Sequence, residues 1–440
     1  MKKADKILIK QKLKESAQVV EKGKSFLYSH YTTGYYDDFF LVHHGKGSRI
    51  FDIDGNEYID FTMALGPLIL GHAHPAVVKA ICEAAQDGGV HSFGEPNEIR
   101  FAEIMVDAVP CADGVTFCNS GTEATMFAIK MARAYTKKVK IGKFEGCYHG
   151  THDYAQISSR FASAGPVEAP SSVADFGGIP QAVVDNVLTF TLNQPETFDR
   201  ILKFKDDLAA IIVEPIPLIC PLVFKDFLLE LREVTKKHNI LLIFDEVITG
   251  FRLGLQGAQG YLNIMPDLAT YGKIIGGGLP IGAIAGQREY METLNLSHRR
   301  NIKGKVYITG TFSGNRITCA AGIATLEFLK NNLHLYEEME NRGRYIMSEV
   351  EAYAHSINFP FQMKGIASIV VPYFHTNEIR IPRDIRWPTN AGRFDLLRKY
   401  MLKYGICLGD SGAILLSTEH TDEDCDFLIE AFKKCLTEML

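Results

Sequence analysis

Residues 209–247 read AAIIVEPIPLICPLVFKDFLLELREVTKKHNILLIFDEV, and this stretch decides the fold. It begins with AAIIVEP (209–215) and ends with ILLIFDEV (240–247), two apolar runs without polar alternation. Between them, FKDFLLELREVTKKHN (224–239) has apolar residues at helical spacing along one face. Apolar strands joined by a helix indicate a parallel sheet that is covered on both faces. We therefore expect an α/β fold whose large domain has a central, mostly parallel sheet.

The carboxyl ends of these two strands carry Glu214 and Asp245. In such sheets, ligands bind outside the carboxyl ends of the strands. Because a bare buried charge is costly, Asp245 needs a partner, and a protonated ring nitrogen is well suited to that position. A structural salt bridge to a lysine or arginine is the alternative for Asp245. Glu214 is placed either to support Asp245 or to orient a hydroxyl group of a ligand.

A second pattern, FCNSGTEATMFAIKMARAY (117–135), is a short apolar segment followed by a helix. One face of that helix is expected to be apolar: Ala124, Phe127, Ala128, Met131 and Tyr135. At its start, Ser120 and Thr122 offer hydroxyls, and Gly121 lets a ligand approach the backbone closely. Together with the free N–H groups of a helix N-terminus, these residues form a site suited to a phosphate monoester. The same residues also fit an ordinary N-cap with Glu123 in the first turn.

A third pattern, YGKIIGGGLP (271–280), places Lys273 ahead of three consecutive glycines. Lys273 is not a phosphate-loop lysine of the Walker type, because positions 267 and 274 are Asp and Ile. The dinucleotide pattern G-x-G-x-x-G after a strand is also missing from the sequence. A lysine held in a low-dielectric site has a depressed pKa and acts as a nucleophilic amine. We expect Lys273 to emerge at the same edge of the sheet as Asp245, with the glycines allowing backbone and ligand to pack tightly.

A weaker pattern, GCYHG (146–150), contributes Tyr148 and His149, which either pack beside a flat ligand or pack simply in the core. With the other patterns it completes an ordered set: a phosphate cradle, an aromatic ring, a carboxylate for a pyridinium and an amine for a Schiff base. That set matches pyridoxal 5′-phosphate (PLP) as the cofactor. No metal ligand set is expected.

Composition narrows the class of protein. The chain has 440 residues, 46% hydrophobic and 22% charged, with a net charge of −5, which gives no cationic field for nucleic acid. Its nine cysteines show no metal-ligand or disulfide pattern, which is typical of a reduced, cytoplasmic protein. The lysine-rich N-terminus resembles a solvated amphipathic helix rather than a secretory signal. The sequence contains no apolar run of 18 residues, so no membrane span is expected.

The sequence also suggests a domain organisation. We expect an N-terminal segment (1–60) that joins a small domain, a large PLP-binding domain (61–315) and a C-terminal small α+β domain (316–440). SRIFDIDGNEYIDF (48–61) predicts a hairpin with a two-residue turn at Asp54-Gly55. The Ser-, Pro- and Gly-rich stretch 160–182 predicts a long loop, either a lid or a plain surface excursion.

Six motifs resemble those of the class III PLP-dependent aminotransferases: NSGTEA, GCYHG, VEP, FDEVITGFR, PDLATYGKIIGGGLPIGA and GTFSGN. KFEGCYHG, GFRLGLQGAQGY and GKIIGGGLPIGA are similar to the glutamate-1-semialdehyde 2,1-aminomutase branch. The resemblance extends over about two thirds of the chain, from about residue 45 to about residue 330. It implies the fold-type-I architecture and a homodimer with active sites at the subunit interface.

The resemblance also implies roles for single residues. Lys273 would form the Schiff base and move the substrate proton, and Asp245 would bond the pyridinium nitrogen. Ser120, Gly121 and Thr122 would hold the phosphate. Tyr148 would stack on the ring and Glu214 would lie near its hydroxyl edge. His149 and Val247 would join the cofactor-binding residues, and Thr311 would reach the phosphate of the partner subunit's cofactor.

The function implied is transfer of an amino group from an amino-acid donor to a keto or aldehyde acceptor. The aminomutase branch carries an arginine near the N-terminus that holds the substrate carboxylate, whereas here the first arginine is Arg49. The C-terminal segment 405–420 and Arg316 also depart from that branch, which favours a different acceptor. A pocket lined by His30, Tyr31, Tyr35 and Tyr36 would suit it, although a surface loop explains these residues equally well. The alternatives are the intramolecular aminomutase and a non-catalytic regulator on the same fold.

Overall fold

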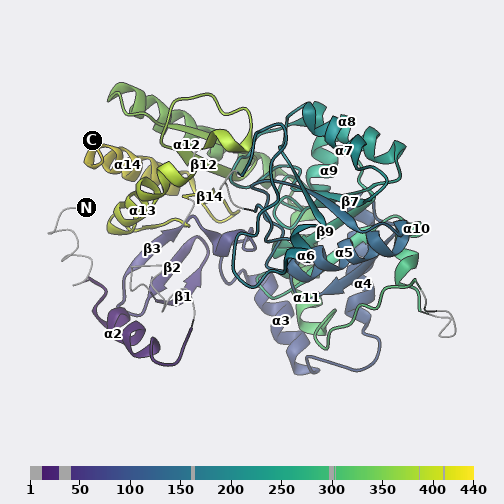
Figure 1. The fold of residues 1–440 in the computed structure, drawn as a ribbon. Helices are drawn as coiled ribbons and strands as arrows, with labels where there is room; N and C mark the ends of the chain where they lie inside the picture. Colours follow the sequence, from purple (N-terminus) through teal and green to yellow (C-terminus); the bar gives the residue numbers. More distant parts are fainter. Residues whose placement is uncertain are drawn as a thin grey trace. The chain divides into compact units, whose positions relative to one another are not determined.

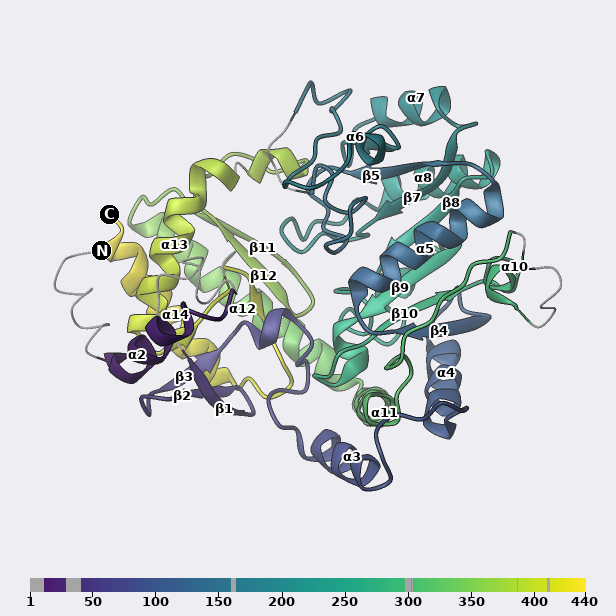
Figure 2. The same cartoon turned by 60° about the horizontal axis from the view of Figure 1, so that its bottom comes forward.

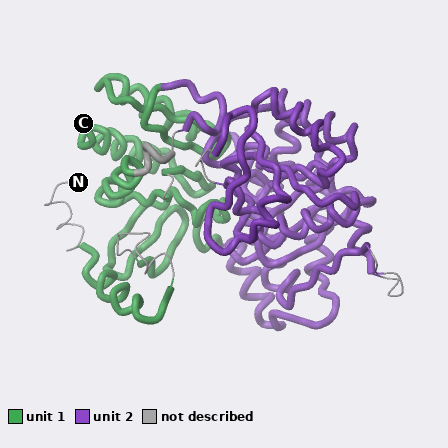
Figure 3. The backbone as a smooth tube through the Cα atoms, in the orientation of Figure 1, with its two compact units in different colours: residues 1–74, 339–376, 389–440 green, residues 75–338, 377–388 purple. Residues whose placement is uncertain are grey.

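A computed structural model describes residues 12–28, 41–159, 164–296, 302, 304–385, 387–409 and 412–440. The chain forms two compact units (Figure 3): unit 1 comprises residues 1–74, 339–376 and 389–440, and unit 2 comprises 75–338 and 377–388. These limits differ from the boundaries expected at residues 60 and 315. The predicted division into domains 1–60, 61–315 and 316–440 stays a prediction.

Unit 2 is built on a seven-stranded sheet of order β4-β10-β9-β8-β7-β5-β6 (Figures 1 and 2). The strands are β4 (Gly114–Cys118), β5 (Lys140–Phe144), β6 (Val187–Phe190), β7 (Leu208–Val213), β8 (Leu241–Asp245), β9 (Leu268–Gly272) and β10 (Gly282–Gly286). β9, β8, β7, β5 and β6 are parallel neighbours, which confirms the predicted mostly parallel sheet. β10 is antiparallel to both β9 and β4. The link between β9 and β10 is too short for the crossover connection that a parallel pair would need.

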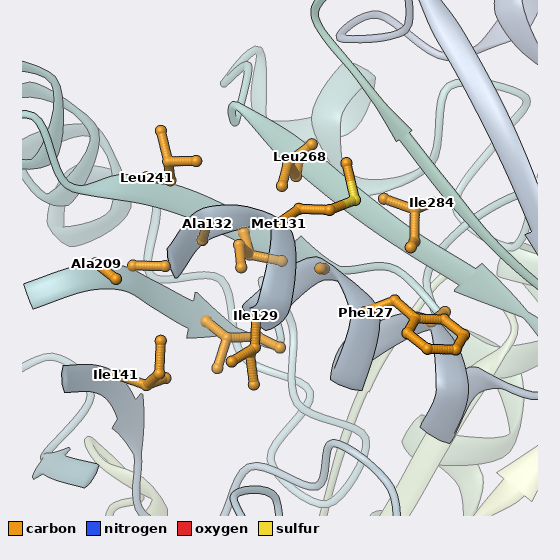
Figure 4. Close-up of a cluster of buried hydrophobic side chains, with 14 of the residues drawn as sticks. Phe127, Ile129, Met131, Ala132, Ile141, Ala209, Leu241, Leu268 and Ile284 are labelled. Carbon is orange, nitrogen blue, oxygen red and sulfur yellow. The ribbon is translucent and has the colours of Figure 1, made fainter. Parts of the chain in front are cut away.

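Helix α5 (Gly121–Thr136) covers one face of this sheet (Figure 4). Its buried side chains pack on apolar residues of the strands, including Ile141, Ala209, Leu241, Leu268 and Ile284. Four of the five residues predicted for its buried face are indeed buried. Tyr135 is the exception at 41% exposed, because its hydroxyl donates to Glu289 Oε2 (3.0 Å) at the surface.

The remaining elements of unit 2 are mostly helices. They are α3 (Pro75–Gln86), α4 (Pro96–Ala108), α6 (Gln181–Val184), α7 (Glu196–Lys203), α8 (Lys225–Lys237), α9 (Gly257–Leu262), η2 (Lys273–Gly276), α10 (Arg288–Met291), η3 (Glu292–Leu294), α11 (Arg316–Asn331) and η4 (Pro382–Ile385). The long α12 (His334–Ser356) begins in unit 2 and continues into unit 1. α11 contacts α3, α4 and η2, which explains why it belongs to unit 2 although the sequence places it in the C-terminal domain.

The glycine run after Lys273 packs against α11. Gly277 has a left-handed φ of +56°, and a Cβ there would lie 2.9 Å from Ala321 O. From the other side, Gly322 of α11 is so close to η2 that a Cβ would lie 2.3 Å from Ile275 O. The glycines therefore allow a helix to approach the turn that carries Lys273.

Unit 1 contains two small sheets. One has the order β1-β2-β3-β13, from β1 (Val42–Lys46), β2 (Arg49–Asp52), β3 (Glu57–Asp60) and β13 (Ile406–Cys407). The other has the order β11-β12-β14, from β11 (Gln362–Ile366), β12 (Ile369–Tyr373) and β14 (Ile414–Leu415). Its other elements are α2 (Lys14–Gly23), η1 (Met63–Leu65), α13 (Trp387–Lys403) and α14 (Asp422–Glu438). Helices with small sheets agree with the α+β character predicted for the smaller part.

The predicted hairpin exists, but its two-residue turn is wrong. β2 and β3 pair antiparallel, and Asp52 N donates to Asn56 O (3.0 Å), so three residues form the loop. The Asp52 carboxylate also accepts from Asn56 N (2.7 Å), and Gly55 adopts φ 85°, which suits the longer loop. Asp54 is thereby free to accept from the N–H groups of Glu15 (2.6 Å) and Ser16 (3.0 Å) at the start of α2.

Three further findings concern the whole described chain. None of the helices drawn from these residues is both long and apolar enough to cross a membrane. Among the same residues, no group of three His, Cys, Asp or Glu side chains is arranged to hold a metal ion. All nine cysteines are free thiols.

The close contact between α11 and η2 generates a stability prediction. Gly322→Ala should lower the free energy of unfolding by about 1–3 kcal/mol, because its Cβ would collide with Ile275 O and with the Phe101 ring. Urea unfolding followed by circular dichroism measures this. Gly392→Ala in α13 is the matched control, since nothing lies within 4 Å of its Cβ, and it should stabilise by up to about 1 kcal/mol. Equal effects of the two substitutions would contradict the packing explanation.

Candidate active site

A pocket of about 210 Å³ opens at the carboxyl edge of the large sheet in unit 2. It is lined by Ser120, Gly121, Thr122, Tyr148, His149, Gly150, Glu214, Asp245, Val247, Ile248 and Lys273. Every residue predicted to bind the cofactor is in this lining except Thr311. The elements explain the convergence, because the lining comes from the segments that directly follow β4, β5, β7, β8 and β9.

Asp245 is the last residue of β8 and is only 4% exposed. Its Oδ2 lies 2.7 Å from His149 Nδ1, and its Oδ1 accepts from Val247 N (3.1 Å) and Thr270 Oγ1 (3.2 Å). Since side chains alternate along a strand, Asp245 points to the same face as Leu241 and α5. No lysine or arginine is among these hydrogen-bond partners. Within the described residues, Asp245 is therefore not paired by a salt bridge to a lysine or arginine.

His149 is neutral in this arrangement. Burial lowers its pKa, and the hydrogen bond to Asp245 only partly opposes that effect. Because Nδ1 faces a carboxylate, Nδ1 carries the proton and Nε2 is an acceptor. His149 Nε2 is buried and has no hydrogen-bond partner within the described chain.

Glu214 directly follows β7 and is 5% exposed. Its Oε2 accepts from the backbone N–H of Tyr148 (2.9 Å), so it fixes the position of that aromatic residue. Burial, and then the negative charge of Asp245, raise the pKa of Glu214 to about 8. Tyr148 itself is 53% exposed, so its side chain is accessible to a flat ligand in the pocket.

Lys273 follows β9 and begins η2 with a left-handed φ of 49°. This conformation is unfavourable for a residue with a Cβ and is typical of strained functional sites. Burial lowers the pKa of Lys273, and the charges of Asp245 and Glu214 oppose that effect. A lowered pKa increases the share of neutral amine, the nucleophilic form.

The start of α5 also lines the pocket. Ser120 is the N-cap, and its Oγ accepts from Glu123 N (3.1 Å), so the capping alternative is correct. The N–H groups of Gly121 and Thr122 still have no acceptor within the helix, because they lie in its first turn. Capping and anion binding are therefore compatible. A Cβ on Gly121 would lie 3.0 Å from the Val247 methyl groups, so glycine keeps this side of the pocket open.

These features fit PLP. The helix N-terminus suits a phosphate, and the exposed Tyr148 side chain suits an aromatic ring. The buried Asp245 carboxylate suits a protonated ring nitrogen, and the amine of Lys273 suits an aldehyde. These four groups line one pocket.

Thr311 lies outside the pocket and is exposed. Its motif, GTFSGN, nevertheless reaches the same end of α5, since Asn119 Nδ2 donates to Ser313 Oγ (3.3 Å). Two apolar side chains of this region are also exposed, Tyr307 at 68% and Phe312 at 61%.

Sequence reasoning missed some residues of the site. Thr270 donates to Asp245 because the two residues are paired in the register of β8 and β9, which local patterns cannot reveal. Gly150 and Ile248 also line the pocket, and each is adjacent to a residue that was predicted. The glycines 276–278 do not line the pocket.

Two predictions on the substrate side remain open. His30, Tyr31, Tyr35 and Tyr36 lie outside the described residues. In the loop 160–182, the described part is anchored to unit 2: Arg200 Nη1 donates to Pro170 O (2.7 Å), and Arg383 Nη1 donates to Gly165 O (3.0 Å). A lid function of this loop stays a prediction.

Fold and site together define a fold-type-I transferase of the PLP-dependent class, and comparisons with known proteins identify the family. The family model for class-III aminotransferases matches residues 31–436. The glutamate-1-semialdehyde 2,1-aminomutase of Sulfurisphaera tokodaii is 40% identical over 406 residues, which cover 91% of this chain and 93% of that protein. An omega-transaminase from Sphaerobacter thermophilus superposes with a TM-score of 0.88 at 32% identity, covering 96% and 97% of the two chains.

A structure described as a transaminase with PLP bound is also similar, with a TM-score of 0.87, 30% identity and coverage of 97% and 98%. The chain belongs to the class-III aminotransferase family. It is an enzyme of the PLP-dependent class, so the predicted family, enzyme class and cofactor are confirmed.

The raised pKa of Glu214 generates a pH prediction for the protein without cofactor. The folded state holds a proton on Glu214 up to about pH 8, whereas the unfolded state releases it near its ordinary value. Stability from this group is therefore complete at low pH and is lost as the pH rises through about 8. Glu214→Gln should be more stable than the wild type at pH 9, with a smaller difference at pH 5. Urea unfolding at the two pH values measures this, and a constant difference would refute it.

Proposed function

We propose that this protein is an aminotransferase that moves an amino group from an amino-acid donor to a keto or aldehyde acceptor, with Lys273 and Asp245 as catalytic residues. The observation that carries the proposal is that one pocket contains the amine of Lys273, the carboxylate of Asp245 and the N-terminus of α5. A non-catalytic regulator does not need all three groups, whereas the described pocket contains all of them.

Each lining residue has a part in binding. Ser120, Gly121 and Thr122 would hold the phosphate with hydroxyl and backbone N–H groups. Tyr148 and Val247 would lie on the two faces of the ring, and Glu214 would face the edge that carries the ring hydroxyl. This placement is supported by the lining of the pocket and by the exposed Tyr148 ring.

Asp245 would hold a proton on the ring nitrogen. Because its three donors are neutral groups, the carboxylate keeps its negative charge. His149 orients that carboxylate through Nδ1. When bound, the cofactor supplies an aldehyde that combines with amines and a ring that accepts electrons.

Lys273 would hold the cofactor through its Nζ and, once displaced by a donor amine, would move the substrate α-proton at Nζ. A lowered pKa suits both tasks, since the neutral amine attacks a carbonyl and also accepts a proton.

We further propose a homodimer with shared active sites, in which Thr311 reaches the phosphate of the partner subunit's cofactor. Support comes from the exposed Thr311 beside the exposed side chains of Tyr307 and Phe312, which a second copy would cover. A cytoplasmic location is part of the same proposal, and nine free cysteines support it. Nucleic acid and membranes are not proposed as partners.

The second candidate is the aminomutase, in which donor and acceptor are parts of one molecule. The identity to relatives that carry the name glutamate-1-semialdehyde 2,1-aminomutase favours it. The lack of any arginine before Arg49 favours the aminotransferase, since the aminomutase branch uses an N-terminal arginine for its substrate carboxylate.

The role of Lys273 has a direct test. Wild-type protein loaded with PLP should absorb visible light, and borohydride reduction should attach the cofactor to Lys273, as peptide mass spectrometry detects. Lys273→Ala should lose this attachment, and amino transfer should fall by on the order of 100- to 10,000-fold. Lys237→Ala on the exposed end of α8 is the control and should behave as wild type. Attachment at a different lysine would sink the assignment.

Single-turnover reactions separate the two candidate functions. The PLP-loaded enzyme is mixed with single amino acids, and the release of the matching keto acid is measured by mass spectrometry. An aminotransferase should release one keto acid per active site. Conversion of glutamate-1-semialdehyde to 5-aminolevulinate without any external donor would instead establish the aminomutase.

A further inference from the structure

Lys143 is a fully buried lysine that the proposed chemistry does not use. It lies on β5, begins the motif KFEGCYHG and is 1% exposed. Its Nζ donates to three backbone carbonyls, those of Cys147 (3.3 Å), Ala155 (3.1 Å) and Ile157 (2.5 Å). An ammonium group has three N–H donors, so all of them are used.

The three acceptors belong to one irregular segment, residues 147–157, which therefore folds around a single ammonium group. A buried charge without a carboxylate partner is costly, and hydrogen bonds to the charged form offset part of that cost. Burial lowers the pKa of Lys143 to about 8, so the group is charged at neutral pH. A neutral side chain of the same length would leave buried carbonyls without donors.

The same segment carries two residues of the pocket, Tyr148 and His149. On the pocket side it is held by Glu214, which accepts from Tyr148 N (2.9 Å), and by Thr125 Oγ1, which donates to His149 O (2.6 Å). Lys143 holds the segment through the carbonyl groups of its first residue, Cys147, and of Ala155 and Ile157 at its other end. The segment is thus held by groups from several elements, and Tyr148 and His149 are part of it.

We propose that Lys143 is a positioning residue, whose ammonium group fixes segment 147–157 so that Tyr148 and His149 take the geometry that the cofactor and Asp245 require. The proposal rests on the proposed function, since it assumes that these two residues meet the cofactor. Its chemical basis is the set of three hydrogen bonds from one buried group to one segment.

The positive charge of Lys143 also supports this role, because it helps to keep His149 neutral. After burial, its positive charge is among the causes that lower the pKa of His149 and of His152. Neutral His149 donates Nδ1–H to Asp245 without cancelling the carboxylate charge. A protonated His149 would form an ion pair with Asp245 and weaken its hold on a ring proton.

The experiment uses PLP-loaded enzyme at pH 7 with Lys143→Met and Lys143→Gln. Methionine keeps an unbranched side chain one atom shorter than that of lysine and has no donor, whereas glutamine keeps two donors. Lys140→Met is the matched control, because Lys140 lies on the same strand and its Nζ donates to a single carbonyl, Asp185 O (2.7 Å). Urea unfolding, the dissociation constant for PLP, the visible circular dichroism of bound PLP and the single-turnover rate at saturating PLP are measured.

For folded Lys143→Met saturated with PLP, the single-turnover rate should fall by on the order of 10- to 100-fold, because a small misplacement of the site suffices for that loss. The visible circular dichroism should change as well, since it reports how the ring is held. Lys143→Gln should lie between Met and wild type, and it decides the outcome where the Met variant does not fold. The control should stay within about twofold of wild type, since its lost hydrogen bond is near the surface.

If Lys143 only stabilised the fold, the experiment would give a different result. The variants would then unfold at lower urea concentrations, but the folded, PLP-saturated enzyme would keep the wild-type rate and circular dichroism. That result overturns the proposal. Failure of the proposed function is distinguishable, because the wild type itself would then release no keto acid in the single-turnover reaction, while the visible circular dichroism of bound PLP would still report how the ring is held.

Discussion

A carboxylate at the end of a buried strand is tolerated only when donors surround it, and the arrangement of the site depends on how this is achieved at Asp245. Three neutral donors from three different segments converge on it: a histidine from the segment after β5, the backbone after β8 and a threonine from β9. This satisfies the carboxylate without cancelling its charge. The negative charge therefore remains available to a ligand, and it affects the pKa of both Glu214 and Lys273.

Lys273 depends on a second constraint, the packing behind it. The strained turn at the end of β9 is held because the glycines after it let α11 approach the backbone closely. Strain in a functional residue persists only when the surrounding structure determines it. In this protein the helix that supports the lysine comes from residues 316–331, far from the lysine in sequence. Lys143 gives corresponding support to segment 147–157, since its ammonium group donates to three carbonyls of that segment.

Much of the site could be predicted from the sequence because its residues follow the strands directly. Glu214, Asp245 and Lys273 each stand where an apolar run ends, and Ser120 to Thr122 stand where a helix begins. These are local signals. The donor Thr270 could not be found this way, because its distance from Asp245 depends on the register between β8 and β9. The partner of the glycines was also hidden: they were expected to let a ligand pack closely, but they contact α11, which is distant in the chain.

The errors have the same origin. The turn at Asp54-Gly55 was expected to be two residues long, but Asp54 accepts from the start of α2 and the loop is longer. Tyr135 was assigned to a buried face by helical spacing, but its hydroxyl finds Glu289 at the surface. By itself, the sequence determined the α/β class, the strand ends that carry the site and the cofactor that they suit, because these depend on patterns within continuous stretches of the chain. The tertiary structure alone decided the donors to Asp245, the strained turn at Lys273 and the burial of Lys143, because each requires contacts between segments that only folding brings together.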